Sequence, residues 1–341
     1  MARLGPRRRE PDVGALVLKN GALIGEGWHA EFGGPHAETL ALKAAGAEAK
    51  GADLVVTLEP CAHRGKTPPC AEAIVDAGIR RVVFGAADVD PRAKGGAGVL
   101  RRAGIAVEGG LLADEVRAQN AAFFHQHAPA DRPMVAIKLA VSLDGRIADH
   151  ERRSQWIAGA ESRGWVHWLR AGFDAIGVGV GTVRSDDPRL TVRGEVTPLV
   201  APLRVVFDDR AKTPVDARIL RDGIASVAIL TAPDAPQARL EKLRDREADV
   251  ITADGLSGQL RALKARGITS LLVEGGGILA GRLVQEGLVD RLFILTAPIM
   301  LGHDGVPAFG ALSGVKLADV HRWRLVGRKS LGADTLIVLD R

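Results

Sequence analysis

The chain has 341 residues, which is enough for about two domains of ordinary size. Hydrophobic residues make up 46% and charged residues 26%, a composition that excludes an intrinsically disordered chain. The net charge of +5 suits an enzyme with phosphorylated substrates. The basic cluster at residues 3–9 lacks the interleaved aromatic residues typical of nucleic-acid binding, so we expect no nucleic-acid partner.

The first part of the chain alternates helices and strands after an opening hairpin. Two apolar runs flank Lys19-Asn20-Gly21, and an Asn-Gly pair between such runs is a hairpin signal. The following residues predict helices at 36–49, 70–77 and 99–103 and strands at 53–58, 81–85 and 105–107. Together these elements predict a compact α/β layer of roughly 120 residues.

The segment 125–133 interrupts this alternation with two prolines and little apolar content. We place the domain boundary there, with one domain over residues 1–126 and a second over 133–341. Further along, the pattern predicts a helix at 160–170 and strands at 134–140, 175–180, 203–207, 227–230, 271–273 and 291–295. This alternation predicts a second α/β unit with a largely parallel sheet.

No stretch reaches the roughly 18 consecutive apolar residues that span a bilayer, so we expect no membrane partner. The basic cluster runs into Glu10-Pro11-Asp12 rather than an apolar core, so we expect no signal peptide. Only two cysteines are present, which excludes a disulfide framework and suits a reducing compartment. We therefore expect a cytoplasmic protein.

Both cysteines lie downstream of a His-Ala-Glu tripeptide. Singly, His36 would be an ordinary helix-start histidine, and Cys61 and Cys70 would be small buried residues. Together they offer one imidazole and two thiols, which suit zinc, and three ligands leave the fourth tetrahedral position open for water. Each falls at or just before a predicted helix start, where the partial positive charge favours a thiolate. We therefore predict a catalytic zinc site.

Glu38 lies two residues after His36 and is not needed as a ligand. A carboxylate beside zinc can take a proton from the metal-activated water and deliver it to a leaving amine. His-x-Glu followed by Pro-Cys-x-x-Cys is the signature of zinc nucleobase deaminases. Here eight residues separate Cys61 from Cys70 instead of two.

The longer spacing points to one subfamily. The run TLEPCAHRGKTPPC, residues 57–70, closely resembles the signature of the pyrimidine deaminases of riboflavin biosynthesis. The resemblance implies a cytidine-deaminase-like α/β/α fold for the first domain. It also implies that His63, Lys66 and Thr67 hold a phosphoribosyl-aminopyrimidine, whereas their positions alone would indicate only a solvated loop.

Two positions of the first domain depart from that family's pattern. The Asn-Pro-x-Val-Gly motif, which contacts substrate in the family, reads EPDVG at 10–14, so a carboxylate replaces the amide at Glu10. The second histidine often seen in HAEVHA is Leu40 here. Neither departure touches the predicted zinc ligands or Glu38.

Motifs of the second domain resemble the reductase that is fused to this deaminase. The matching runs are KLAVSLDGRIA (138–148), SQWI (154–157), GVGTVRSDDPRLTVR (179–193) and LVEGGGILAGRLV (272–284). The resemblance implies a dihydrofolate-reductase-like α/β domain that uses NADPH. Lys138 and Asp144 lie beside its site by motif, and Ala158 stands where the family commonly has Thr.

The same runs assign residues to two ligands. Those implied to contact the ribosylaminopyrimidine are Ser154, Arg170, Leu190, Arg193 and Glu274. Those implied to line NADPH are Trp156, Thr182, Asp186, Gly276 and Gly277. Guanidinium groups suit a phosphate by charge and planar shape. Without the motifs, the arginines would indicate surface charge, the tryptophan a core aromatic, and the glycines a tight strand–helix turn rather than a G-x-G-x-x-G fingerprint.

Together the resemblances cover nearly the whole chain and imply a bifunctional enzyme of the RibD/RibG family, a homo-oligomer that acts on small phosphorylated pyrimidines. Its first reaction would be the zinc-dependent hydrolytic deamination of 2,5-diamino-6-ribosylamino-4(3H)-pyrimidinone 5′-phosphate. Its second would be the NADPH-dependent reduction of 5-amino-6-(5-phosphoribosylamino)uracil, with hydride delivered to C1′ of the ribose.

Three other interpretations stay open. The chain could keep only one of the two activities. It could be a zinc deaminase of free nucleosides or tRNA, although the long loop between the cysteines and the fused second domain argue against this. It could also be a non-catalytic, zinc-stabilised nucleotide-binding protein, which the presence of Glu38 beside an open ligand set disfavours.

Overall fold

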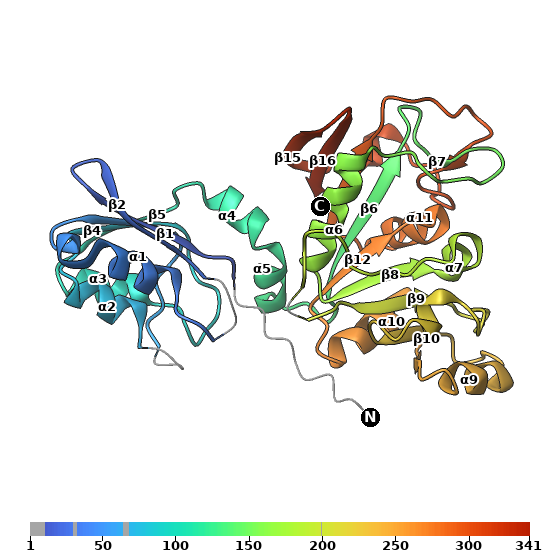
Figure 1. Ribbon diagram of the computed structural model, residues 1–341, viewed down its shortest axis with the longest axis horizontal. Coiled ribbons are helices and arrows are strands. Elements are labelled where there is room, and N and C mark those ends of the chain that lie inside the picture. The colour runs from blue at the N-terminus through green and yellow to red at the C-terminus, as the bar shows by residue number, and fades with distance from the viewer. Residues whose placement is uncertain (1–10, 30–32, 64–67, 199) are drawn as a thin grey trace. The chain divides into compact units, whose positions relative to one another are not determined.

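The computed structural model describes residues 11–29, 33–63, 68–198 and 200–341. These residues form two compact units, which divide between Ala130 and Asp131 (Figure 1). Each unit has a sheet and a hydrophobic core of its own. Among the described residues, no helix combines the length and the apolar character that crossing a bilayer needs.

A five-stranded sheet in the order β2-β1-β3-β4-β5 forms the centre of the first unit. Its strands are β1 (Gly14–Lys19), β2 (Ala22–Trp28), β3 (Asp53–Leu58), β4 (Arg81–Ala86) and β5 (Ala106–Gly109). The helices are α1 (Ala37–Ala45), α2 (Cys70–Asp76), α3 (Gly96–Arg102), α4 (Ala113–Gln119) and α5 (Ala121–His127), with a 3-10 turn η1 (Gly46–Ala49). β1 is antiparallel to β2 and β3, whereas β3, β4 and β5 are parallel.

The predicted hairpin and the first helices and strands of this unit are confirmed. Asn20 and Gly21 turn β1 into β2 with φ of 53° and 81°, the left-handed values that a tight hairpin turn needs. The sequence analysis missed α4 and α5, and α5 continues to His127, into the first residues of the segment 125–133. These two helices supply Val116 and Phe123 to a small cluster at the ends of β3 and β4.

Helices α1, α2 and α3 cover one face of the sheet (Figure 1). The first of them lies directly against β2, because glycines stand at the contact. A Cβ atom on Gly27 would lie 2.4 Å from the carbonyl oxygen of Ala37, and one on Gly25 would lie 2.4 Å from that of Ala41. This close approach fixes the first turn of α1 on the sheet.

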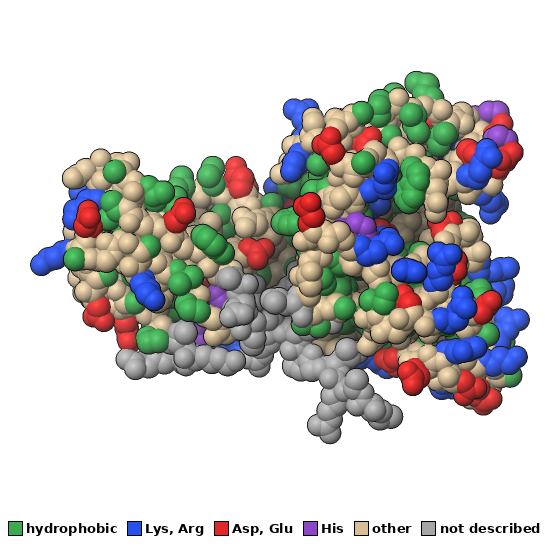
Figure 2. Space-filling view, in the orientation of Figure 1, with side chains coloured by type: hydrophobic (Ala, Val, Ile, Leu, Met, Phe, Trp, Pro, Cys, Tyr) green, Lys and Arg blue, Asp and Glu red, His purple; other side chains and the backbone are tan. Residues whose placement is uncertain are grey.

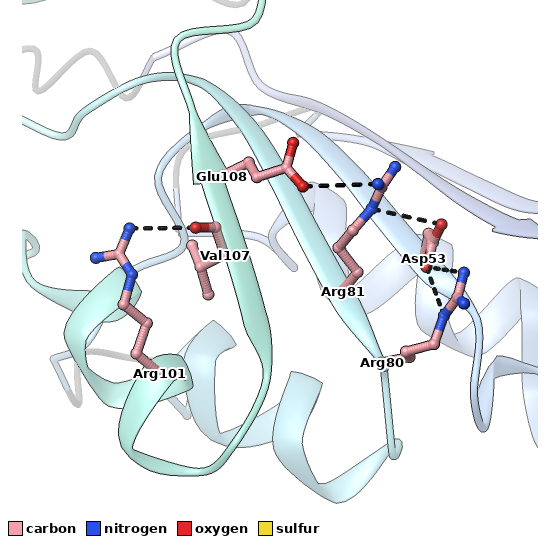
Figure 3. A network of polar contacts seen from close by, with 6 residues as sticks. All are labelled: Asp53, Arg80, Arg81, Arg101, Val107 and Glu108. Atoms are coloured by element: carbon pink, nitrogen blue, oxygen red, sulfur yellow. Dashed lines mark hydrogen bonds and ion pairs between the residues drawn. The ribbon is translucent and has the colours of Figure 1, made fainter.

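Charged side chains join the amino ends of the parallel strands (Figure 3). Asp53 Oδ1 accepts hydrogen bonds from Arg80 Nε at 3.1 Å and Nη2 at 2.9 Å. Arg81 Nε lies 3.6 Å from Asp53 Oδ2, and its Nη1 lies 3.6 Å from Glu108 Oε1. Since the arginines are exposed, each pair adds little to stability. The network lies at the end of the sheet opposite to the carboxyl end of β3.

The second unit is built on a nine-stranded sheet in the order β11-β10-β9-β8-β12-β6-β13-β16-β15. Its strands are β6 (Met134–Val141), β8 (Ala175–Gly179), β9 (Leu203–Phe207), β10 (Val227–Thr231), β11 (Asp249–Thr252), β12 (Ser270–Glu274), β13 (Arg291–Thr296), β15 (Arg324–Leu331) and β16 (Asp334–Asp340). The short strands β7 (Arg146–Ala148) and β14 (Val306–Pro307) pair separately. The helices are α6 (Ala160–Ala171), α7 (Val180–Asp186), α8 (Arg218–Arg221), α9 (Gln237–Arg244), α10 (Gly255–Ala265) and α11 (Gly277–Gln285), with a 3-10 turn η2 (Leu317–Asp319).

Both faces of this sheet are covered. α6 and α9 pack on one face through Leu169 and Leu240, and α10 and α11 pack on the other through Leu260 and Leu283. Strands buried on both faces are mostly apolar, which is why the sequence shows β8, β10 and β12 as nearly continuous apolar runs, whereas β9 is apolar except for the buried Arg204.

The predicted parallel strands β6, β8, β9, β10, β12 and β13 are confirmed. The sequence analysis missed the strands at the two edges of the sheet. At one end, β11 is a short strand that pairs with β10. At the other, β16 and β15 are antiparallel to β13 and to each other. β15 is an edge strand with mostly exposed side chains, so its sequence lacks the apolar run that marks a buried strand.

We predict that Gly27→Ala lowers the unfolding free energy by about 1–3 kcal/mol, because the added methyl group pushes α1 away from β2. Urea unfolding followed by circular dichroism measures the change. Gly164→Ala is the matched control, because a Cβ there meets nothing within 4 Å, and alanine favours the helix. Equal stability of Gly27→Ala and the wild type would contradict the proposed helix–strand constraint.

Candidate active sites

The structure brings His36, Cys61 and Cys70 together in the first unit. His36 immediately precedes α1, Cys61 follows β3, and Cys70 is the first residue of α2. His36 Nδ1 lies 3.1 Å from Cys70 Sγ and 3.6 Å from Cys61 Sγ. One ligand atom from each of the three lies within 4.8 Å of the others.

These distances fit a tetrahedral zinc ion. Bond lengths of about 2.0 Å to nitrogen and 2.3 Å to sulfur place two ligand atoms roughly 3.5 Å apart. Among the described residues, this is the group that could hold a metal. Three such ligands, two of them soft thiols, select zinc and leave one position for water.

Hydrogen bonds favour the thiolate form of Cys61. Its Sγ accepts a hydrogen bond from the backbone N–H of Cys70 at 3.3 Å. The Cys70 thiol also donates to it, and this bond is the largest of the effects that lower the pKa of Cys61 to about 4. The same bond, together with burial, raises the pKa of Cys70. Cys61 is therefore the first of the two thiols to lose its proton.

Glu38 lies in the first turn of α1 with its side chain buried beside this cluster. Burial raises the pKa of its carboxyl group, and the nearby Cys61 raises it further, while a backbone hydrogen bond and the charge of His36 oppose the rise. A buried carboxyl group with a raised pKa is suited to accept a proton and to return it during a reaction. The geometry thus places a proton carrier next to the metal ligands.

Glu59, which the sequence analysis missed, supports the loop that holds Cys61. Its Oε1 accepts hydrogen bonds from the backbone N–H groups of Ala97 at 3.0 Å and Gly95 at 3.3 Å. Its Oε2 accepts one from Asp88 N at 3.2 Å. This carboxylate therefore ties the start of α3 to the residues before Cys61. Its place in the TLEPC run, two residues before a ligand, is the signal that could have found it.

The other candidates of the first unit are only partly described. His63 is exposed on the loop after Cys61. Lys66, Thr67 and Glu10 lie outside the described residues. Leu40, at the position of the second histidine of the related motif, is half-buried on α1.

A cavity of about 1510 Å³ in the second unit collects all the residues that the resemblance assigned to the reductase ligands. They are Ser154, Trp156, Arg170, Thr182, Asp186, Leu190, Arg193, Glu274, Gly276 and Gly277. The volume is ample for a dinucleotide and a second ligand, since pockets for one small ligand span about 300–1000 Å³. Lys138 and Ala158 also line it.

Three buried charges form one wall of this cavity. The Arg170 guanidinium binds Glu274 in a bidentate pair, with Nε–Oε1 2.6 Å and Nη2–Oε2 2.9 Å. Lys138 Nζ lies 3.8 Å from Glu274 Oε2. Burial alone would raise the pKa of Glu274, but the charges of Arg170 and Lys138 outweigh burial and lower it to about 2. Glu274 is therefore a fixed negative charge near neutral pH.

Glycine backbone lines another part of the cavity, where α11 begins. Gly275 and Gly276 have φ of 77° and 80°, and a Cβ on Gly276 would lie 3.2 Å from Thr182 Oγ1. A Cβ on Gly277 would lie 2.3 Å from the carbonyl oxygen of Pro307. Side-chain-free backbone at a helix start beside a threonine hydroxyl suits the diphosphate of a dinucleotide.

Trp156 presents an exposed ring to the same cavity. The Arg163 guanidinium stacks on this ring, with Cζ 4.7 Å from the ring centroid, and its Nη1 donates to the carbonyl oxygen of Ala158 at 2.7 Å. The sequence analysis missed Arg163 and His167, although they share a face of α6 with Arg170 at spacings of four and three residues. That periodicity is the signal that could have found them.

Asp144 is placed by the structure outside the residues that line the cavity. Its Oδ1 accepts hydrogen bonds from Ser142 Oγ at 2.6 Å and Leu301 N at 3.1 Å, and its Oδ2 accepts one from Gly302 N at 2.7 Å. It thereby holds the loop that leads into the cavity-lining segment 304–307. The geometry gives Asp144 a positioning role.

We predict that Cys70→Ser lowers the zinc content of the purified protein to well below one ion per chain, because a hard hydroxyl replaces a soft thiolate. Glu38→Gln is the matched variant: it alters the same buried cluster but removes no metal ligand, so its zinc content should equal that of the wild type. Metal analysis after dialysis measures both. Full zinc occupancy in Cys70→Ser would exclude this ligand set.

We predict that Glu274→Gln costs about 3–5 kcal/mol at pH 7, because Arg170 and Lys138 are then left buried without a counter-charge. The pKa of Glu274 is lower in the folded state than its ordinary value of 4.5, so its stabilisation is full above pH 4.5 and is lost as the pH falls towards 2. The variant and the wild type should therefore converge in acid. Urea unfolding at pH 7 and at about pH 2.5 tests this, with the exposed Glu286→Gln as control. A pH-independent difference would contradict it.

The comparisons with known proteins cover both units. Residues 133–337 match the family described as the RibD C-terminal domain, and residues 1–86 match the cytidine and deoxycytidylate deaminase zinc-binding region. The riboflavin biosynthesis protein RibD of Aquifex aeolicus is 39% identical over 342 residues, which are 99% of this chain and 94% of the relative. That of Mycobacterium tuberculosis H37Rv is 39% identical over 334 residues, 97% of this chain and 91% of the relative.

Solved structures of RibD proteins also match this chain over both units. Form 1 of Acinetobacter baumannii RibD has a TM-score of 0.80 at 36% identity and covers 99% of this chain and 94% of its own. A Thermotoga maritima protein, described as a diaminohydroxyphosphoribosylaminopyrimidine deaminase/5-amino-6-(5-phosphoribosylamino)uracil reductase, has a TM-score of 0.81 at 33% identity with the same coverage. The predicted fold class, a cytidine-deaminase-like domain followed by an α/β reductase domain, is confirmed. The chain belongs to the RibD family of riboflavin biosynthesis proteins.

Proposed function

We propose that this chain catalyses two consecutive steps of riboflavin biosynthesis, a deamination in the first unit and a reduction in the second. The observation that carries the proposal is that one chain brings together groups suited to each of the two reactions. His36, Cys61 and Cys70 stand beside the buried Glu38 in one unit, and the reductase candidates line a single cavity in the other.

In the first unit, we assign the deamination of 2,5-diamino-6-ribosylamino-4(3H)-pyrimidinone 5′-phosphate. His36, Cys61 and Cys70 would hold the zinc ion, which supplies an activated water when bound. Glu38 accepts a proton from that water and donates it to the departing amine, so that a C–O bond forms at the ring carbon, the C–N bond breaks and ammonia leaves. His63, Lys66 and Thr67 are the candidates that position the substrate.

In the second unit, we assign the reduction of 5-amino-6-(5-phosphoribosylamino)uracil. NADPH, when bound, supplies the hydride that C1′ of the ribose receives, and the protein's part is to position the reactants. Gly276, Gly277 and Thr182 suit the cofactor's diphosphate, and Trp156 and Asp186 line the same cavity. Substrate contacts are assigned to Ser154, Arg170, Leu190, Arg193 and Glu274.

We assign the deaminase to residues 1–126 and the reductase to 133–341, and the chain to a cytoplasmic homo-oligomer that acts on small phosphorylated pyrimidines rather than nucleic acid. Both candidate sites suit small molecules, because one is a buried metal-ligand cluster and the other is a cavity with room for a dinucleotide and a second ligand. Light scattering should show more than one chain per particle. The small-molecule assignment is supported if the protein shows no steeply salt-dependent affinity for RNA, because such affinity is the sign of phosphate contacts along a nucleic acid.

The decisive experiment follows NADPH oxidation by the zinc-loaded protein supplied with either the aminated or the deaminated pyrimidine phosphate. We expect oxidation with both compounds in the wild type. In Glu38→Ala, oxidation should vanish with the aminated compound and persist with the deaminated one, because the variant lacks only the proton carrier of the first unit.

Each of the other outcomes selects an alternative. Turnover of the deaminated compound alone by the wild type would mean a chain with only the reductase activity. Turnover of neither compound would refute the bifunctional assignment. Unchanged oxidation of the aminated compound in Glu38→Ala would remove Glu38 from the mechanism.

A further inference from the structure

Arg170, one of the candidate substrate contacts in the second unit, already has hydrogen-bond partners within the protein. Arg170 uses Nε and Nη2 for its bidentate pair with Glu274, and its Nη1 donates to the carbonyl oxygen of Thr191 at 2.8 Å. Its positive charge is balanced by Glu274 at a short distance. A phosphate dianion in this cavity therefore needs further cations.

The segment 189–193 provides two of them on a firmly held backbone. Arg204, which is fully buried, donates from Nη1 to the carbonyl oxygen of Arg189 at 3.2 Å. The backbone N–H of Arg193 donates to His167 Nδ1 at 3.2 Å. With the Arg170–Thr191 bond, three basic side chains hold the backbone of this segment at both ends and in the middle.

The arrangement leaves the guanidinium groups at both ends of the segment available. Leu190 and Thr191 are buried between them, whereas Arg189 and Arg193 are exposed and line the cavity. Neither guanidinium has a carboxylate partner among the described residues, unlike Arg210, Arg218 and Arg282 on the same cavity.

The two arginines are also close enough to repel each other electrostatically. Burial, followed by the charges of Arg170 and Arg189, lowers the pKa of Arg193. Figure 2 shows Lys and Arg side chains gathered on the second unit over the region where Figure 1 places α7 and β9. Like charges held together without counter-charges are typical of a site for a multivalent anion.

We propose that Arg189 and Arg193 together bind the 5′-phosphate of the reductase substrate, which makes Arg189 an additional substrate-binding residue. This inference rests on the proposed function, because it names the part of that substrate which the cavity recognises. The two guanidinium groups supply the charge of the phosphate subsite, while Arg170 holds Glu274 in place and can add its remaining N–H groups.

The first test is a binding measurement that does not depend on turnover. Ribose 5-phosphate serves as the probe in calorimetric titrations of the wild type, Arg189→Met and Arg189→Lys. We expect Arg189→Met to raise the dissociation constant about tenfold, which corresponds to roughly 1.4 kcal/mol. Arg189→Lys should recover part of the loss, because it restores the charge without the planar fork.

Arg184→Met is the matched control. Arg184 is exposed on α7, three residues before Asp187, and is absent from the residues that line the cavity. Its replacement removes the same charge, so its affinity for ribose 5-phosphate should stay at the wild-type value. NADP⁺ is titrated into each variant as well, because a site for a cofactor phosphate would respond to that ligand instead.

The second test compares the phosphorylated pyrimidine with its dephosphorylated form in the reductase reaction. In Arg189→Met, the ratio of the two kcat/KM values should fall about tenfold, through KM for the phosphorylated compound, with kcat at saturation retained. An unchanged ratio and an unchanged ribose 5-phosphate affinity would overturn the proposal, as would weakened binding of NADP⁺ alone. If the wild type reduces neither compound, the proposed reductase function fails. The ribose 5-phosphate titration then still shows whether Arg189 contributes to a phosphate-binding site.

Discussion

Parallel strands bring their carboxyl ends to one edge of a sheet, and both candidate sites depend on that constraint. In the first unit, the chain leaves β3 at this edge, passes through Cys61 and starts α2 at Cys70. In the second, β12 ends at Glu274 and leads through Gly276 into α11, next to the turn from β8 into α7. Helix starts with free N–H groups therefore meet side chains from neighbouring strands at both sites.

The two sites handle buried charge differently. In the first unit, burial outweighs the opposing charge of His36, so the pKa of the Glu38 carboxyl group is raised, which suits it to proton transfer. In the second, Glu274 is equally buried but lies against Arg170 and Lys138, so it stays ionised. A carboxylate that keeps its charge can orient a polar ligand but cannot supply protons near neutral pH. Environment thus separates one proton carrier from one fixed charge.

The sequence could predict those parts of the fold whose cause is local. β3 and β9 match their predicted bounds because each is a short, mostly apolar run with a clear end. The zinc ligands could be proposed because the chain has only two cysteines, and both follow one His-x-Glu. Resemblance to known motifs supplied the reductase candidates, which spacing alone would not have grouped.

What the sequence could not predict depends on contacts between distant segments. The pairing of Arg170 with Glu274 joins positions 104 residues apart, and the bonds that Asp144 accepts from 301 and 302 span more than 150. α4 was missed because only one of its residues, Val116, is buried, so it shows no apolar stripe. Arg189 looks like any surface arginine until Arg204 is seen to hold its carbonyl oxygen.

The central claim is that one chain contains two separable sites, of which only the first needs zinc. The most direct measurement removes the metal with a chelator and restores it stepwise, while ammonia release from the aminated pyrimidine and NADPH oxidation with the deaminated one are followed in parallel. We predict that ammonia release is lost and returns in proportion to zinc, saturating near one ion per chain, while NADPH oxidation stays constant throughout. Ammonia release that persists without metal, or NADPH oxidation that rises and falls with zinc, would contradict the account.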